Sequence, residues 1–175
     1  ALQRHLDRMP VPFPATASGV EISLLRRLFS PQDARLALLL GMIPEPLAAI
    51  RRRAGRTMTS ASLAAALDGM AERGLIQRVR TKRGLLYGKA PLVIGFYESQ
   101  VNRLTPGFQR DFERYGDEGF AEALAAQTPQ LRTVPINQPI PFERVVGRYD
   151  DIRAFVRASP GPFAVMNCIC QQGKD

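Results

Sequence analysis

The sequence predicts an α+β fold that is mainly helical. Its 175 residues are 45% apolar, which is enough to build the core of one large domain or two small ones. Apolar residues recur at helical spacing through the N-terminal part of the chain, and the stretch LIQRVRTKRGLLYGKA then has the pattern of two strands around a turn. These two observations predict a set of helices followed by a β-hairpin.

The first two predicted helices meet at a proline. Ser30-Pro31 ends the helix that begins near Gly19 and starts the next, because proline is well accepted at the first helical position. We expect this second helix to run to about Ile43. The apolar face of the first helix contains Leu24, Leu25, Leu28 and Phe29.

Two further helices are bounded by prolines, glycines and a capping residue. The third follows Pro44 and Pro46 and ends at Gly55, and the fourth begins after a cap at Thr59 or Ser60 and ends at Gly74. The apolar stripe of the fourth helix is formed by Leu63, Leu67, Met70 and Ala71.

The hairpin turn is predicted at Thr81 to Gly84, where Gly84 supplies the positive φ that such turns often need. Helices followed by a basic hairpin are typical of a winged helix-turn-helix domain, in which three apolar helix faces close a small core. We therefore expect such a domain, with an N-terminal arm, over residues 1–90.

Residues 91–175 are predicted to form a smaller α+β segment. Phe108, Phe112 and Tyr115 recur at helical spacing, and a proline-rich connection follows over residues 128–142. Asp150 can cap another helix, and the run FAVMNCIC is expected to be a strand that carries the two cysteines. The face expected to be buried on that helix consists of Ile152, Phe155 and Val156.

The positive charge is concentrated in one quarter of the chain. Residues 51–90 contain ten basic and two acidic residues, a net +8 that equals the charge of the whole protein. Clustered positive charge favours contact with phosphates or with an acidic partner.

A DNA-binding function is one hypothesis for this charge. Arg78 and Arg80 project from the same face of a strand, with Lys82 and Arg83 at the tip, so the wing can grip phosphates. The fourth helix lacks the Arg, Lys, Asn and Gln side chains that read bases best. Two alternatives stay open: a DNA-binding transcriptional regulator that responds to redox state or metal, and a packing or docking module. The outward positions of that helix are Ser60, Ala61, Ala64, Ala65, Asp68, Gly69 and Glu72.

The sequence does not predict an enzyme. It contains one histidine, His5, in an N-terminal segment that we expect to be peripheral, and it has no phosphate-binding glycine loop. We interpret the acidic cluster Asp117, Glu118 and Glu122 as a solvated helix face. The longest apolar run, LALLLGMI, is too short to cross a bilayer, so we expect a cytoplasmic protein without membrane insertion.

Cys168 and Cys170 are the only cysteines, and they are separated by one residue. Two thiolates can begin a metal site, but a closed tetrahedral site needs about four protein ligands. Their spacing alone also suits ordinary buried apolar residues. A zinc-binding structural module is a further alternative, and it would take its other ligands from a second chain or from downstream sequence.

Three separated stretches carry a resemblance to a known family. These stretches are VPFPATASGVEISLLRRLFSPQDARLALLLGMIPEPLAAIRRRAG, TPQLRTVPI and FAVMNCIC. The chain resembles the N-terminal, winged-helix-like region of ferredoxin-type 4Fe-4S iron-sulfur proteins of anaerobic bacteria. In that family the element matching Cys168 and Cys170 is followed by further cysteines and by CxxCxxCxxxC cluster-binding runs.

Those later cysteines are absent from this sequence. The resemblance therefore implies that the remaining ligands of a 4Fe-4S cluster lie downstream of Asp175, and that this chain alone holds no cluster. It also implies a non-catalytic, intracellular role in electron transfer. The chain would act by docking to a downstream iron-sulfur domain or to a redox partner protein.

Overall fold

A computed structural model describes residues 1–55, 58–125 and 149–174. The chain forms two compact units. One unit is Ala1–Gln130 together with Asn167–Asp175, and the other is Leu131–Met166. This division differs from the two domains expected from the sequence, which meet at residue 90.

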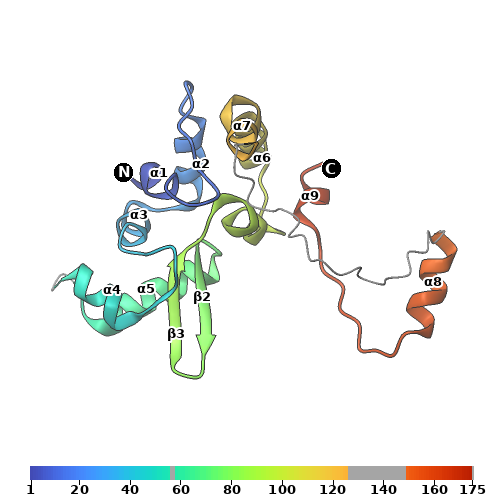
Figure 1. The fold of residues 1–175 in the computed structure, drawn as a ribbon. Coiled ribbons are helices and arrows are strands. Elements are labelled where there is room, and N and C mark those ends of the chain that lie inside the picture. Colours follow the sequence, from blue (N-terminus) through green and yellow to red (C-terminus); the bar gives the residue numbers. More distant parts are fainter. Residues whose placement is uncertain (56–57, 126–148, 175) are drawn as a thin grey trace, which may run out of the picture. The chain divides into compact units, whose positions relative to one another are not determined.

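The first unit combines helices with one small antiparallel sheet (Figure 1). The fold class is thus α+β and mainly helical, as predicted. Its first elements are α1 (Leu2–Leu6), α2 (Val20–Leu28), α3 (Pro31–Ala37), β1 (Glu45–Pro46), α4 (Leu47–Ala54), α5 (Ser60–Glu72), β2 (Ile76–Thr81) and β3 (Gly84–Lys89). These are followed by η1 (Leu92–Phe96), η2 (Glu98–Gln100), α6 (Pro106–Tyr115), η3 (Gly116–Phe120), α7 (Ala121–Leu124) and α9 (Ile169–Gln172).

Local capping explains where α3 and α5 begin. The Ser30 hydroxyl accepts a hydrogen bond from the Asp33 amide, and the Asp33 carboxylate accepts one from the Ser30 amide. The Thr59 hydroxyl accepts from the Ser62 amide at the start of α5. Both predicted helix starts are therefore confirmed.

The predicted end of α3 at Ile43 is wrong, because the helix ends at Ala37. Beyond it, the Gly41 carbonyl accepts a hydrogen bond of 2.9 Å from the amide of Lys89 on β3. Pairing with the sheet thus replaces a further helical turn. As a result Met42 and Ile43 are exposed.

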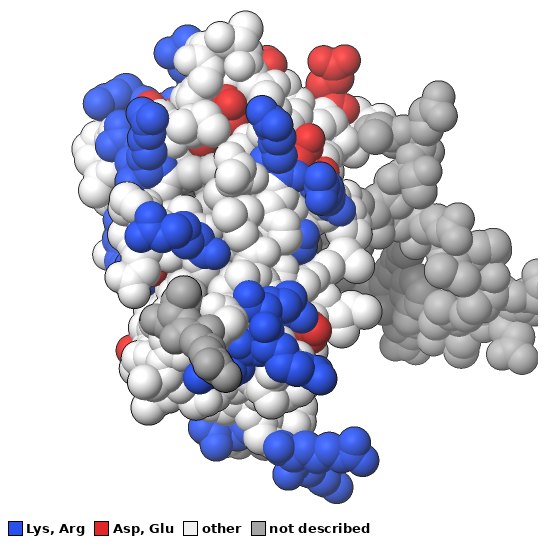
Figure 2. All heavy atoms as spheres, turned by 90° about the vertical axis from the view of Figure 1, so that its left-hand side faces the viewer, with Lys and Arg blue, Asp and Glu red and all other residues white. Residues whose placement is uncertain are grey.

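The hairpin has the predicted turn. β2 and β3 pair without interruption from Ile76 opposite Lys89 to Thr81 opposite Gly84, and β1 adds to the other side of β3. The Thr81 hydroxyl donates to the Gly84 carbonyl at 2.9 Å, and Gly84 has a φ of 120°. Figure 2 shows basic side chains at the lower end of the molecule, where the hairpin lies in Figure 1.

The N-terminal segment is part of the core. Phe13 is 1% exposed and packs against Phe96 and Tyr115, with ring centroids 6.2 Å and 5.0 Å apart. His5 is half-buried, and its Nε2 lies 3.0 Å from the Leu40 carbonyl oxygen. The expectation that the segment carrying His5 is peripheral is therefore wrong.

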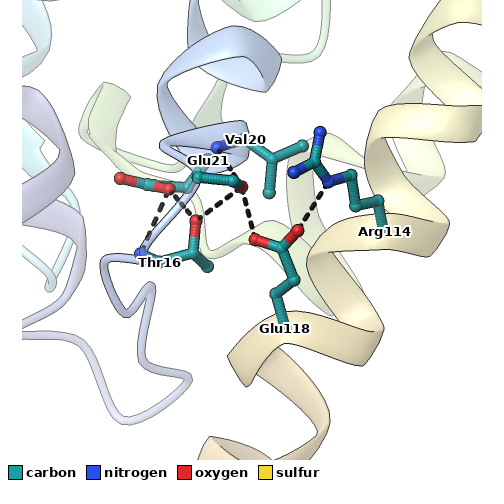
Figure 3. Close-up of polar contacts among 6 residues, drawn as sticks. Thr16, Val20, Glu21, Arg114 and Glu118 are labelled. Carbon is teal, nitrogen blue, oxygen red and sulfur yellow. Dashed lines mark hydrogen bonds and ion pairs between the residues drawn. The ribbon is translucent and has the colours of Figure 1, made fainter.

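Polar contacts also tie this segment to α2, α6 and η3 (Figure 3). The Thr16 amide and hydroxyl both donate to the Glu21 carboxylate, at 3.2 Å and 2.6 Å. The Ser18 hydroxyl donates to Glu118, which also accepts a hydrogen bond of 2.5 Å from Arg114 Nε. Glu118, predicted to be simply solvated, thus has defined partners.

In the second unit α8 (Tyr149–Ala158) forms close to the predicted helix. Phe155 and Val156 are 73% and 46% exposed, so the predicted burial of that face is wrong for these two residues. The proline-rich connection at 128–142 lies outside the described residues. No helix among the described residues has both the length and the apolar character that a bilayer crossing requires.

Removing the hydroxyl of Tyr115 tests how the N-terminal segment is held. Tyr115 is fully buried and donates a hydrogen bond of 3.0 Å to the Pro14 carbonyl. We expect Tyr115→Phe to lower the free energy of unfolding by about 0.5–1.5 kcal/mol, because the half-buried Pro14 carbonyl loses its hydrogen-bond donor. Urea denaturation measures this change. Tyr97→Phe is the matched control, because its hydroxyl makes only a long contact of 3.4 Å to Gln109; an equal loss in both variants would contradict the assignment.

The stability of the fold should also depend on His5. Burial, the largest cause, lowers the pKa of His5 below 6.5. The unfolded chain therefore takes up the proton first, and stability should fall as the pH drops through 6.5 towards the folded-state pKa. Urea midpoints between pH 7.5 and 5 measure this loss. The His5→Asn variant should show a smaller loss over that range, and an identical pH dependence in the two proteins would contradict the prediction.

Candidate functional sites at the cysteine pair and the basic hairpin

The two cysteines flank a buried residue. Cys168 and Cys170 are exposed and free, whereas Ile169 between them is 4% exposed and belongs to the core. The predicted strand is wrong: residues 163–167 form no regular structure, and the chain turns into α9 directly after Cys168. Both thiols nevertheless reach the surface, because Ile169 takes the inward position.

Asn102 forms hydrogen bonds on both sides of the two cysteines, to residues at the ends of the segment 167–172, called here the cysteine segment. Its side-chain oxygen accepts hydrogen bonds from Asn167 Nδ2 at 2.6 Å and from Gln172 Nε2 at 2.7 Å. The backbone N–H of Asn102 donates to Gln172 Oε1 at 2.8 Å. Asn102 has a φ of 65°, a left-handed conformation that asparagine adopts more readily than most residues. The sequence analysis missed this residue, and nothing but its tolerance of positive φ pointed to it.

The backbone at the start of α9 favours the thiolate of Cys168. The N–H groups of Gln171 and Cys170 lower the pKa of Cys168, because their dipoles stabilise negative charge on sulfur. Hydrogen bonding by these backbone N–H groups is the largest cause of the lowered pKa.

Cys170 borders a hollow of about 310 Å³ with an aromatic wall. Tyr97 and Phe112 stack there with ring centroids 3.7 Å apart, and Glu98 and Glu113 also line it. Within the described part of the chain, however, no three His, Cys, Asp or Glu side chains are grouped closely enough to hold a metal ion. Cys168 and Cys170 thus offer two soft sulfur ligands, half of a tetrahedral set.

The four predicted wing residues differ in their surroundings. Arg78 donates to Asp68 at 2.9 Å and lies 3.9 Å from Glu72, so it is engaged with α5. By contrast Arg80, Lys82 and Arg83 are exposed, and the ion pairs found among the described residues include none of these three.

Asp68 is the centre of a network that the sequence analysis missed. Its Oδ1 accepts hydrogen bonds from Arg78 and, at 3.0 Å, from the hydroxyl of Tyr87 on β3. The network joins α5 to both strands of the hairpin. Its members lie 10 and 19 residues from Asp68 in the sequence, which is why local spacing gave no indication of it.

Comparisons with known proteins give no relative. The chain matches no family model, no curated protein and no solved structure.

The reactivity of Cys168 tests the electrostatics of the α9 start. In a Cys170→Ser variant, Cys168 is the remaining thiol, and its reaction with iodoacetamide follows the thiolate fraction. We expect the rate to reach half its maximum at a lower pH in the folded protein than in the same variant unfolded in urea. Equal midpoints in the two states would show that the backbone amides have no effect on this thiol.

Proposed function

We propose that this chain is a non-catalytic region of an intracellular, ferredoxin-like iron-sulfur protein that takes part in electron transfer. It would present Cys168 and Cys170 as two ligands of a metal centre, and it would act by docking to the polypeptide that completes the centre. The resemblance of its sequence to the N-terminal region of such proteins motivates this proposal.

The observation that carries the proposal is the anchoring of an exposed cysteine pair. Ile169 is buried between the two thiols, and Asn102 bonds residues on either side of them. A ligand pair held in this way has lost part of its conformational freedom before the metal arrives, which lowers the cost of forming the centre. Ordinary core cysteines would be buried instead.

The donor set fits an iron-sulfur cluster in type but not in number. Cysteine thiolates hold such clusters, and a 4Fe-4S cluster takes four of them. Cys168 and Cys170 would supply two, and the others would come from outside residues 1–175. When bound, the cluster would supply one-electron redox chemistry, while this chain would hold and shield it.

The element order supports a docking role for the remainder of the unit. The order α3, β1, α4, α5, β2, β3, with sheet order β1-β3-β2, is compatible with a winged helix-turn-helix domain. We propose this fold for the part of the chain up to Lys89. The aromatic core joins it to the helices that carry the cysteine segment.

Iron content tests the ligand assignment. In a longer polypeptide that carries this chain and a downstream CxxCxxCxxxC segment, purified without oxygen, we expect bound iron and acid-labile sulfide. Cys168→Ser and Cys170→Ser should each lower both contents and the visible absorption of the cluster. Ala164→Ser, at an exposed neighbouring position, is the matched control and should leave them unchanged.

Unchanged iron and sulfide in both cysteine variants would overturn the proposal. A zinc-binding structural module is the alternative metal function. In that case zinc bound by residues 1–175 alone should increase with protein concentration, because two chains would then contribute four thiolates to one ion.

A further inference from the structure

We propose that the tip of the hairpin binds the phosphate backbone of double-stranded DNA without reading its sequence. The tip is defined here as Arg80, Lys82 and Arg83. This site is separate from the cysteine pair, and the proposal does not depend on the iron-sulfur function.

The tip presents three cations that are available to a ligand. All three side chains are exposed, and none belongs to the ion pairs found among the described residues. Lys82 and Arg83 form the two-residue turn itself, and Arg80 lies on the strand just before it. Two neighbouring arginines, Arg73 and Arg78, are less available to phosphates, because they form ion pairs with Asp33 and Asp68.

The tip is also held in place. The strands pair up to Thr81 opposite Gly84, and the Thr81 hydroxyl both donates to the Gly84 carbonyl and accepts from the Arg83 amide. Midway along its strands, at the pair Arg78 and Tyr87, the hairpin is joined to α5 through Asp68. An ordered turn loses less conformational entropy on binding than a free loop, so its cations can act together on neighbouring phosphates.

The hairpin network also reduces repulsion from the nearest acids. Asp68 and Glu72 of α5 would meet a phosphate backbone unfavourably if they were free. Asp68 instead bonds Arg78 and Tyr87, and Glu72 lies 3.9 Å from Arg78. Arg78 thus acts as an internal counter-ion, and the three tip residues remain available for DNA.

Helix α5 offers nothing that distinguishes base pairs by hydrogen bonding. Its exposed positions near the N-terminus are Ser60, Ala61, Ser62 and Ala65, which lack the bidentate groups that recognise guanine or adenine. Contacts to phosphates alone carry no sequence information. Binding through the tip is therefore expected to be independent of sequence.

The surrounding surface favours the approach of a polyanion. On the side of the molecule drawn in Figure 2, Lys and Arg are numerous and Asp and Glu are few. A positive electrostatic field of this kind increases the rate of association with an anionic partner, and salt screens this effect.

A salt titration tests the site. Fluorescence anisotropy would follow binding of residues 1–175 to a labelled 20-base-pair duplex from 20 to 300 mM KCl. Each phosphate contact adds about 0.9 to the slope of log K against log salt. We expect the variant Arg80→Ala/Lys82→Ala/Arg83→Ala to lower the slope by about 2 to 3 and the affinity at the lowest salt by roughly tenfold or more.

The matched control is Arg4→Ala/Arg26→Ala/Arg35→Ala, which removes the same charge from exposed positions on α1, α2 and α3. It should change the slope by less than 1, and a second duplex of the same length and different sequence should bind within about twofold. The thermal midpoints of both variants should match that of the parent, because all six side chains are exposed.

Three results of the titration would overturn the proposal. These are equal losses in the tip and control variants, no binding of the parent chain at 20 mM KCl, and a strong preference for one duplex, which would place base-reading groups in the interface. Polyglutamate serves as the probe for an acidic protein partner. If it displaced the duplex at an equal concentration of charges, the tip would be assigned to acidic proteins and not to DNA.

Discussion

The packing of Phe13 against Phe96 and Tyr115 is the interaction on which the first unit depends. It brings together the N-terminal segment, η1 and α6, which are far apart in the sequence. Phe29, at the end of α2, joins this cluster by packing against Phe96, with ring centroids 5.8 Å apart. One buried cluster therefore contains residues of the N-terminal segment, of the hairpin and of the helices that follow it.

The two candidate sites are supported in different ways. The cysteine segment rests on this buried cluster through Ile169 and is fixed by Asn102, which follows η2. The hairpin is held by a different polar network, centred on Asp68. Since the two networks share no residue, a variant that disturbs one should leave the other intact, and the two proposals can be tested separately in the same chain.

Local features of the fold were predictable from the sequence where a single residue type determines the backbone. Ser30-Pro31, Thr59 and Gly84 mark helix starts and a turn because of their own side chains or the lack of one, and each was placed correctly. The end of α3 was not predictable, because the residues up to Ile43 are apolar enough for a helix. It depends on the bond between Gly41 and Lys89, which exists only once the sheet has formed.

The candidate sites show the same difference between local features, which the sequence predicts, and long-range contacts, which it does not. The types of residue that could bind metal or phosphate were evident from composition, whereas their partners were not. Arg78 and Arg80 look equivalent on a strand, yet Arg78 is bound by Asp68 from a different element. Only the folded chain distinguishes a cation that stabilises the hairpin from cations that are available to a ligand.

The cysteine pair shows why an incorrect local prediction can still lead to a useful site. A strand over FAVMNCIC would have placed both thiols on one face with Ile169 on the other. The observed backbone is different, with an extended Cys168 followed by a short helix, but Ile169 still turns inward. Burial of the apolar residue, and not the secondary structure, decides that both thiols face outward. In this backbone the burial of Ile169 accompanies the exposure of Cys168 and Cys170 on either side of it.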